Sequence, residues 1–470
     1  MWNLEGHRSS PTAWFIAALV IIPHFAKAQD DPPNPSPLLT DELLFVPPPT
    51  QGMARANSSE KVIDAPAVYV VKDLGTLGGT SSTAFGVNAS GQVAGSAMSS
   101  DRFNHAFITG PDGAGMTRLA DGGLGSNGYG INDLGQVTGA QLHAFITGPN
   151  GGGLTDIGTL GGTDSAGIGV YTSGQVVGES LTTGNSTYHA FITGPNGVGI
   201  RDLGTLGGGY STAHSINNDG QVAGYSSRWD RYGNFGAFIT GPDGTGMTYI
   251  GTLGGDYSLG LAINSQGQVT GSAATSGNRI ANAFITGPNG VGMTDIGNLG
   301  GRGSLGFGIN DNGDVVGRAE LPDWTSTAFV YRDGLLLDLN ALIGVAVSRL
   351  TLTQALQINN AGQITAWGVD SESHPSEYHG YLLTPVSLAL SKLLMKVQDV
   401  GAGESLVVQV THAQTYYAVP DIQATCAMLT AFLHTVSAQS GKGISQTDAE
   451  KLQVDAQTIV VSINCKQNST

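Results

Sequence analysis

The stretch His189-Ala190-Phe191-Ile192-Thr193-Gly194-Pro195-Asn196-Gly197 decides the fold, because the chain repeats it. Five copies share Ala-Phe-Ile-Thr-Gly-Pro, and two looser copies follow. Successive copies start 38, 46, 47, 46, 45 and 52 residues apart, at His105, His143, His189, Gly236, Asn282, Thr327 and His379. A repeat of this length supplies four short strands to one propeller blade. We therefore predict an all-β, seven-bladed β-propeller of four-stranded blades over residues 67–386. A parallel solenoid is the competing fold, but its repeats would be shorter and more uniform.

Each repeat contains two tight turns. One is Asn217-Asn218-Asp219-Gly220, where Asn can hydrogen-bond the turn backbone and Gly can take a positive φ. The other is Gly194-Pro195-Asn196-Gly197, which joins the Ala-Phe strand to the first strand of the next unit. These two strands should therefore share a blade. The strand at Tyr69–Leu74 then lacks a partner, and we expect it to pair with Tyr381–Thr384 and close the ring.

The composition favours turn-dense β-structure, with 71 glycines and only 12% charged residues. The chain carries 20 basic and 36 acidic side chains, a net charge of -16. Such a surface repels polyanions, so we expect neither a nucleic-acid partner nor binding to anionic membranes. These numbers leave the oligomeric state open.

The N-terminus has the order of a secretory signal. Arg8 precedes the apolar run 14–22, and Ala26-Lys27-Ala28 offers a small-residue cleavage site. We predict a signal peptide at 1–28 and a Pro-rich linker at 29–66. No later stretch is long enough to span a bilayer, so we expect a secreted or cell-surface protein without membrane insertion.

After Pro385 the glycine repeat gives way to helical periodicity. We predict an all-α domain at 387–466, with helices at about 387–399, 403–418, 421–439 and 445–463. Ser445 and Asp448 have capping spacing. Cys426 and Cys465 are the chain's two cysteines, and an antiparallel pair of helices would bring them together. We expect them to form a disulfide.

The wording of the repeat resembles the HAF family of probable extracellular bacterial repeats. The resemblance rests on Asp-Leu-Gly-Thr-Leu-Gly-Gly, Ile-Asn-x-x-Gly-Gln-Val and His-Ala-Phe, and it covers about residues 68–385. It implies export and a propeller-like repeat, and it carries no assigned chemistry. The segment Thr425–Cys465 resembles the FIMAH-type helical tails of secreted bacterial proteins, which implies an accessory or docking module.

The sequence lacks the common catalytic motifs. Gly-x-Ser-x-Gly, His-Glu-x-x-His and the phosphate-binding Gly-x4-Gly-Lys-Ser/Thr motif do not occur, so we predict no catalytic residue, no cofactor and no metal. The repeated histidines could line one sector and bind a metal, but a hydrogen bond to the neighbouring blade is the simpler interpretation. For the repeated carboxylates we expect structural hydrogen bonds rather than calcium binding, at Asp73, Asp156, Asp202 and Asp295.

The connection that precedes the Ala-Phe strand is the most variable part of the repeat. Such loops on a rigid scaffold suit recognition, and aromatic and Arg side chains dominate binding hot spots. We predict a contact surface at Arg228, Trp229, Arg231, Tyr232, Phe235 and Trp324; the alternative is that these aromatics cap the blade edge.

The predicted function is a non-catalytic scaffold that binds an extracellular protein or glycan. The alternative is a polysaccharide-active hydrolase or lyase that uses loop carboxylates, with Asp230, Asp323, Asp370 and Glu372 as candidates.

Overall fold

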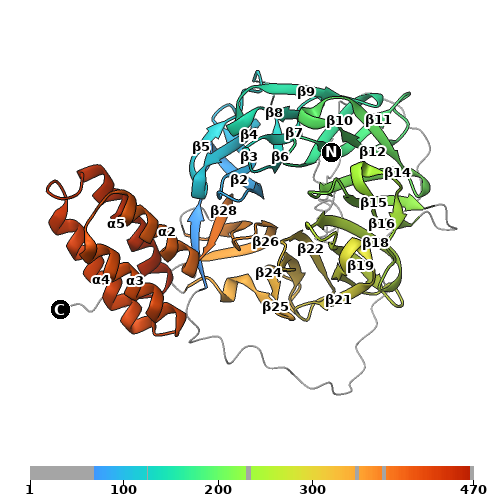
Figure 1. Cartoon of the computed structure of the whole chain (residues 1–470). Helices are drawn as coiled ribbons and strands as arrows, with labels where there is room; N and C mark the ends of the chain where they lie inside the picture. Colours follow the sequence, from blue (N-terminus) through green and yellow to red (C-terminus); the bar gives the residue numbers. More distant parts are fainter. Residues whose placement is uncertain (1–67, 124, 229–233, 345–348, 373–376, 466–470) are drawn as a thin grey trace, which may run out of the picture. The chain divides into compact units, whose positions relative to one another are not determined.

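The computed structural model describes residues 68–465, apart from 124, 229–233, 345–348 and 373–376. The predicted signal peptide and linker lie outside the described residues. The described chain forms seven four-stranded antiparallel sheets arranged as blades of a ring, followed by four helices (Figure 1). The predicted fold class is thus confirmed.

Each blade is numbered here from its innermost strand outward. Blades 1 to 3 contain β2 (Gly78–Val87), β3 (Val93–Ser99), β4 (Asn104–Gly110) and β5 (Ala114–Arg118); β6 (Asn127–Ile131), β7 (Val137–Ala140), β8 (Ala144–Thr147) and β9 (Leu154–Gly158); and β10 (Gly161–Val170), β11 (Val176–Thr182), β12 (Tyr188–Thr193) and β13 (Ile200–Gly204). Blades 4 and 5 contain β14 (Gly207–Ile216), β15 (Val222–Arg228), β16 (Phe235–Ile239) and β17 (Thr248–Tyr249); and β18 (Gly254–Ile263), β19 (Val269–Thr275), β20 (Ala281–Thr286) and β21 (Met293–Gly297). Blades 6 and 7 contain β22 (Ser304–Ile309), β23 (Val315–Glu320), β24 (Ser326–Arg332) and β25 (Leu335–Asp338); and β26 (Leu350–Ile358), β27 (Ile364–Asp370), β28 (Tyr378–Pro385) and β1 (Tyr69–Asp73).

Blade 7 closes the ring with strands from both ends of the repeat region. β1 pairs with β28 in antiparallel register, from Tyr69 opposite Pro385 to Asp73 opposite Tyr381. The side chain of Asn359 reaches across the same seam, where its Nδ2 donates to the carbonyl of Asn88 at 2.9 Å. The predicted closure is confirmed, and it removes two sheet edges that would otherwise be open to intermolecular pairing.

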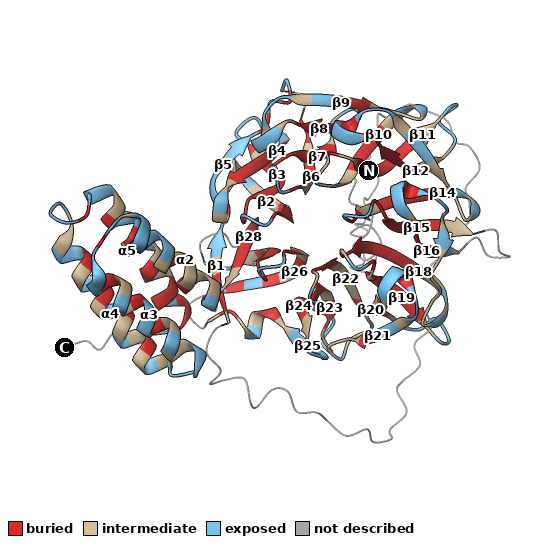
Figure 2. Cartoon of the chain, viewed as in Figure 1, coloured by how far each residue is buried: buried red, intermediate tan, exposed pale blue. Residues whose placement is uncertain are grey.

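The repeated words Val-x-Gly and Ala-Phe-Ile form one packing unit. In blade 4, Gly224 of the second strand pairs with Phe238 of the third, and a Cβ at Gly224 would lie 2.8 Å from the Phe238 ring. Phe238 is fully buried, as are the equivalent phenylalanines of blades 1, 3, 5 and 6. Glycine therefore makes room for the ring. Figure 2 shows the result: buried residues dominate the second and third strands, such as β3 and β4, and exposed residues mark outer strands such as β5 and β9.

A serine on each of five innermost strands joins neighbouring blades, and Ser126 does the same directly before β6. Ser211 Oγ of blade 4 accepts from the backbone N–H of Ala190 in blade 3 and donates to the carbonyl of Gly204. Ser82 repeats the contact across the seam, where it accepts from Gly380 N–H. These bonds satisfy backbone groups that the sheets leave unpaired.

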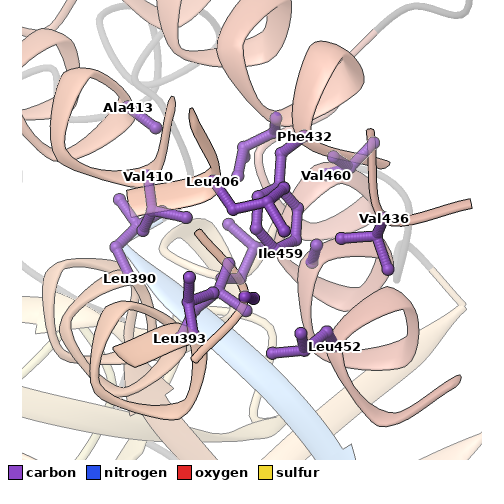
Figure 3. Close-up of a cluster of buried hydrophobic side chains, with 14 of the residues drawn as sticks. Leu390, Leu393, Leu406, Val410, Ala413, Phe432, Val436, Leu452, Ile459 and Val460 are labelled. Atoms are coloured by element: carbon purple, nitrogen blue, oxygen red, sulfur yellow. The ribbon is translucent and has the colours of Figure 1, made fainter. Parts of the chain in front are cut away.

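The four helices occupy the predicted ranges. They are α2 (Val386–Asp399), α3 (Glu404–Ala418), α4 (Ile422–Gln439) and α5 (Gln446–Ser462). Ser445 Oγ accepts from the Asp448 N–H, which confirms the predicted cap. The helices pack around a shared apolar core (Figure 3), where the labelled side chains of Leu406, Phe432 and Ile459 lie close together.

The helical tail also packs onto the seam of the ring. Val70 of β1 belongs to the apolar core of the helices, and Lys392 of α2 forms an ion pair with Asp112 of blade 1. The predicted disulfide joins Cys426 to Cys465, with Cα atoms 5.5 Å apart. In the part of the chain that the structure describes, no helix is both long and apolar enough to cross a membrane.

Candidate binding face

The connections between second and third strands emerge on one face of the ring, because antiparallel strands place alternate connections at opposite ends of a blade. We call these connections the variable loops. Six of them expose a large apolar side chain, either within the loop or at the first residue after it. We call this set the apolar collar: Phe103 (55% exposed), Leu142 (68%), Phe235 (38%), Ile280 (38%), Trp324 (57%) and Tyr378 (41%). Six blades thus each place one exposed apolar side chain at the face where the variable loops emerge.

The structure places three of the six predicted contact residues. Trp229, Arg231 and Tyr232 lie outside the described residues. Arg228 and Phe235 are in strands, as the last residue of β15 and the first of β16, which corrects their predicted place in the loop. The reason is that Ser227 pairs with Phe235, so the hairpin extends further than the turn chemistry indicated.

Arg228 is held by its surroundings. Its Nη2 donates to the Asp256 carbonyl at 2.6 Å, and its guanidinium lies 4.6 Å from the centre of the Tyr249 ring. Phe235 packs edge to face against Tyr225 and Tyr210. Arg228 is therefore engaged with blades 4 and 5, whereas Phe235 packs within blade 4 and still exposes part of its ring.

The Trp324 side chain is exposed to solvent. It has a positive φ of 71° in the variable loop of blade 6, and the Arg302 guanidinium stacks on its ring at 3.7 Å. A stacked cation holds an exposed ring in one orientation, which lowers the entropy lost when a ligand packs against it. Trp324 is therefore 57% exposed while its ring is stacked on Arg302.

The repeated histidines bind carboxylates of their own blade, and the expected bond to the neighbouring blade is wrong. His189 Nδ1 lies 2.8 Å from Asp202 Oδ2, and both residues belong to blade 3. His143 pairs with Asp156, and His379 pairs with Asp73. The sheet order explains the difference, because the histidine is on the third strand and the carboxylate on the fourth strand of the same blade. These two strands come from adjacent sequence repeats.

The carboxylates have the structural role that we expected for them. Asp202 Oδ1 accepts from the backbone N–H of Gly204, where the chain begins its crossing to the next blade. In blade 5 an asparagine replaces the histidine, and Asn282 Nδ2 donates to Asp295 at 2.9 Å. The hydrogen bond to Asp73 is the largest of the effects that raise the pKa of His379.

The loop carboxylates of the hydrolase alternative serve local turns where the structure describes them. Asp323 accepts from Thr325, Asp370 accepts from the Glu372 N–H, and Glu372 forms an ion pair with Arg349. Asp230 lies outside the described residues. Among the described residues, no three His, Cys, Asp or Glu side chains are grouped so that they could hold a metal ion.

One set of residues escaped sequence reasoning. In the second strand of six blades, the motif Val-x-Gly is followed by a residue whose type differs from blade to blade: Ser96, Ala140, Glu179, Tyr225, Ser272 and Arg318. In blade 7 the motif ends in Ala366, and Trp367 takes this position. Glu179 is 2% exposed and accepts a hydrogen bond from the Tyr210 hydroxyl at 2.7 Å. The signal that could have revealed it is an acidic residue directly after the repeated motif Val-x-Gly of a predicted strand.

Comparison with known proteins adds little to this geometry. No family model matches the chain, and no curated protein matches it. The chain is similar to the β-propeller domain of the Trilobed protease from Pyrococcus furiosus, with 12% identity, 55% of this chain and 81% of that chain covered, and a TM-score of 0.39. It is also similar to TolB from Acinetobacter baumannii (10% identity, 62% and 63% covered, TM-score 0.37) and to a prolyl endopeptidase (12%, 68% and 50%, 0.41). The fold assignment rests on the strand pairing of the chain itself.

Proposed function

We propose that this chain is an exported β-propeller of the HAF type that binds an extracellular protein or glycan through the variable-loop face. The apolar collar is the observation that carries the proposal. Solvent-exposed Phe, Trp and Tyr rings supply large contact areas with few rotatable bonds, and they serve protein hot spots as well as sugar faces. The ring holds the loops on a rigid frame, so their side chains can act together.

The opposite face gives this proposal a matched control. Val198 and Val291 are 71% and 72% exposed, and each directly follows a Gly-Pro-Asn-Gly turn at the other end of its blade. Their replacement removes exposed apolar surface without touching a variable loop.

Labelled mature protein should be screened against arrays of glycans and matrix proteins. We expect a ligand whose binding weakens at least about tenfold when Leu142 and Trp324 are both changed to Ala, since truncation of buried hot-spot residues costs about 2 kcal/mol or more. The Val198→Ala/Val291→Ala variant should bind like the wild type. Equal binding by the wild type and both variants would exclude the collar.

A further inference from the structure

We propose that a pH-sensitive latch holds the variable loop of blade 1, because a doubly protonated histidine ties this loop to the start of the crossing to blade 2. The latch consists of four charged residues: His105, Asp101, Asp121 and Arg118. It sets the position of Phe103, the collar residue of this loop. As a device that regulates the collar the latch rests on the proposed function, whereas its chemistry can be tested without any ligand.

His105 lies between two carboxylates. It is the second residue of β4 and is fully buried. Its Nδ1 lies 2.5 Å from Asp121 Oδ2, and its Nε2 lies 2.9 Å from Asp101 Oδ2. Hydrogen bonds from the Ser99 hydroxyl and the Phe103 N–H lower the pKa of Asp101 to about 2, so this carboxylate is ionised. An ionised carboxylate can only accept hydrogen bonds, so both ring nitrogens carry a proton and the ring is an imidazolium.

The charges around the ring balance only while it is protonated. Asp101 faces the ring from the variable loop, Asp121 from the segment that follows β5, and Arg118 from the last position of β5. Arg118 Nη2 donates to Asp121 Oδ1 at 2.9 Å, and its Nη1 lies 3.5 Å from Asp101 Oδ2. Although burial opposes it, hydrogen bonds from His105 and Arg118 lower the pKa of Asp121. Two positive charges thus face two negative charges, and loss of one proton from the ring leaves one carboxylate without a counter-charge.

Loss of that proton should break the bond to Asp101 rather than the bond to Asp121. A neutral imidazole keeps one N–H. Asp121 is buried, and its Oδ2 also accepts from Ser126 Oγ at 2.8 Å, so loss of the N–H there would leave a buried carboxylate short of a donor. The Asp101 side chain is 41% exposed, and water can replace the ring. The latch is therefore closed at low pH and opens as the pH rises through the titration of His105.

Asp101 organises the loop that the latch holds. Its Oδ1 accepts from Ser99 Oγ at 2.6 Å and from the Phe103 N–H at 2.9 Å. Arg102, between Asp101 and Phe103, has a positive φ of 70°. This conformation is unfavourable for a residue with a side chain, so the loop depends on the contacts of Asp101. Release of Asp101 from the ring should therefore loosen the turn and change the position of Phe103.

The other repeated histidines do not meet this condition. His143 and His189 are partly exposed, and each contacts one carboxylate through Nδ1. A neutral ring with one N–H can make such a bond. The Nε2 of His379 lies 3.9 Å from Glu377 Oε2, beyond hydrogen-bonding distance. At His105 both nitrogens lie within hydrogen-bonding distance of a carboxylate, which is what requires the second proton.

Limited trypsin digestion of the mature protein tests the latch without a ligand. Trypsin can cut after Arg102 in the latched loop and after Arg279 in the corresponding loop of blade 5, and both residues are exposed. Blade 5 carries Asn282 in place of the histidine, so its loop has no titrating ring and serves to cancel the pH dependence of trypsin itself. We expect the ratio of the two initial rates, Arg102 to Arg279, to rise about tenfold between pH 6 and pH 9.5. Cleavage follows the open population of the loop, and loss of one charge-assisted hydrogen bond shifts that population by about this factor.

Two variants and a second readout accompany the digestion. His105→Asn copies Asn282 of blade 5 and should make the ratio independent of pH. Asp101→Asn is an exposed change whose amide can donate to Nε2 of a neutral ring, so it should also remove the rise, and it keeps the proposal testable if His105→Asn unfolds. In the wild type labelled with 15N-histidine, the His105 ring signals should be those of an imidazolium at pH 6 and should change over the same pH range as the ratio.

A ratio that stays constant in the wild type, or a rise that either folded variant retains, would overturn the proposal. Resistance of Arg102 to trypsin at every pH, while Arg279 is cut, would also overturn it. These results do not bear on ligand binding by Leu142 and Trp324, which lie in other blades. Conversely, an array screen that finds no ligand leaves the latch in place.

Discussion

Removal of the disulfide should destabilise the helical tail before the propeller. Cys426 and Cys465 are 39 residues apart in sequence, so their bond closes a loop of about 40 residues. In the chain-entropy model this closure stabilises the folded state by about 4 kcal/mol. The double variant Cys426→Ser/Cys465→Ser should lose that amount, which lowers the folding equilibrium constant of the tail by roughly a factor of a thousand.

The chain allows the two parts to be followed separately. Residues 386–465 contain no tryptophan, whereas Trp324 and Trp367 report on blades 6 and 7. Urea unfolding can therefore be followed by circular dichroism at 222 nm for the helices and by tryptophan fluorescence for the propeller. With an m-value of about 1.5 kcal/mol/M, the 222 nm midpoint of the double variant should fall by roughly 2 to 3 M.

The fluorescence midpoint should fall much less, because Val70 is the residue of the ring that belongs to the helical core. The wild type under reducing conditions is the control and should behave like the double variant. An unchanged 222 nm midpoint would refute the loop-closure argument. An equal shift in both signals would show that the tail and the ring unfold as one unit.

Two further predictions concern the seam and the blades. His379→Asn should keep the bond to Asp73, as Asn282 does with Asp295, but remove the titration of residue 379. Because Asp73 raises the pKa of His379 in the folded state, the wild type should be more stable than this variant below about pH 6.5, and the difference should disappear as pH rises through the raised pKa. Melting temperatures of the two proteins that differ by a constant amount between pH 5.5 and 9 would contradict this. Gly224→Ala should cost about 1 to 3 kcal/mol or more, because the added Cβ would lie 2.1 Å from the Thr212 carbonyl oxygen and against the Phe238 ring, whereas Gly209→Ala meets nothing closer than 3.9 Å and should be nearly neutral in the same denaturation experiment.

The internal repeat explains why the fold could be predicted. One blade shows where the strands and turns lie, and seven copies fix the ring. The pairing of Tyr69–Asp73 with β28 followed from the same argument, since both segments lacked a partner. The start of the last helix was predictable because Ser445 is a local signal that acts through the backbone N–H of Asp448.

The candidate sites were less predictable because they depend on contacts between blades. Arg228 and Phe235 read as loop residues, and only the pairing of Ser227 with Phe235 places them in strands. Glu179 directly follows the repeated Val-x-Gly motif of its strand, and its hydrogen-bond partner Tyr210 is in the next repeat, 31 residues away. A sequence pattern gives the strand of each residue, but it does not give which hydroxyl meets which carboxylate.

The central claim is that the variable-loop face binds the partner, and hydrogen exchange of the complex tests it most directly. With a ligand from the array screen bound, we expect slower amide exchange in the segments that carry the collar, such as 99–104 and 321–326. The Gly-Pro-Asn-Gly turns at 194–197 and 287–290 should exchange as they do in the free protein. Protection at these turns, with the collar segments unchanged, would contradict the account.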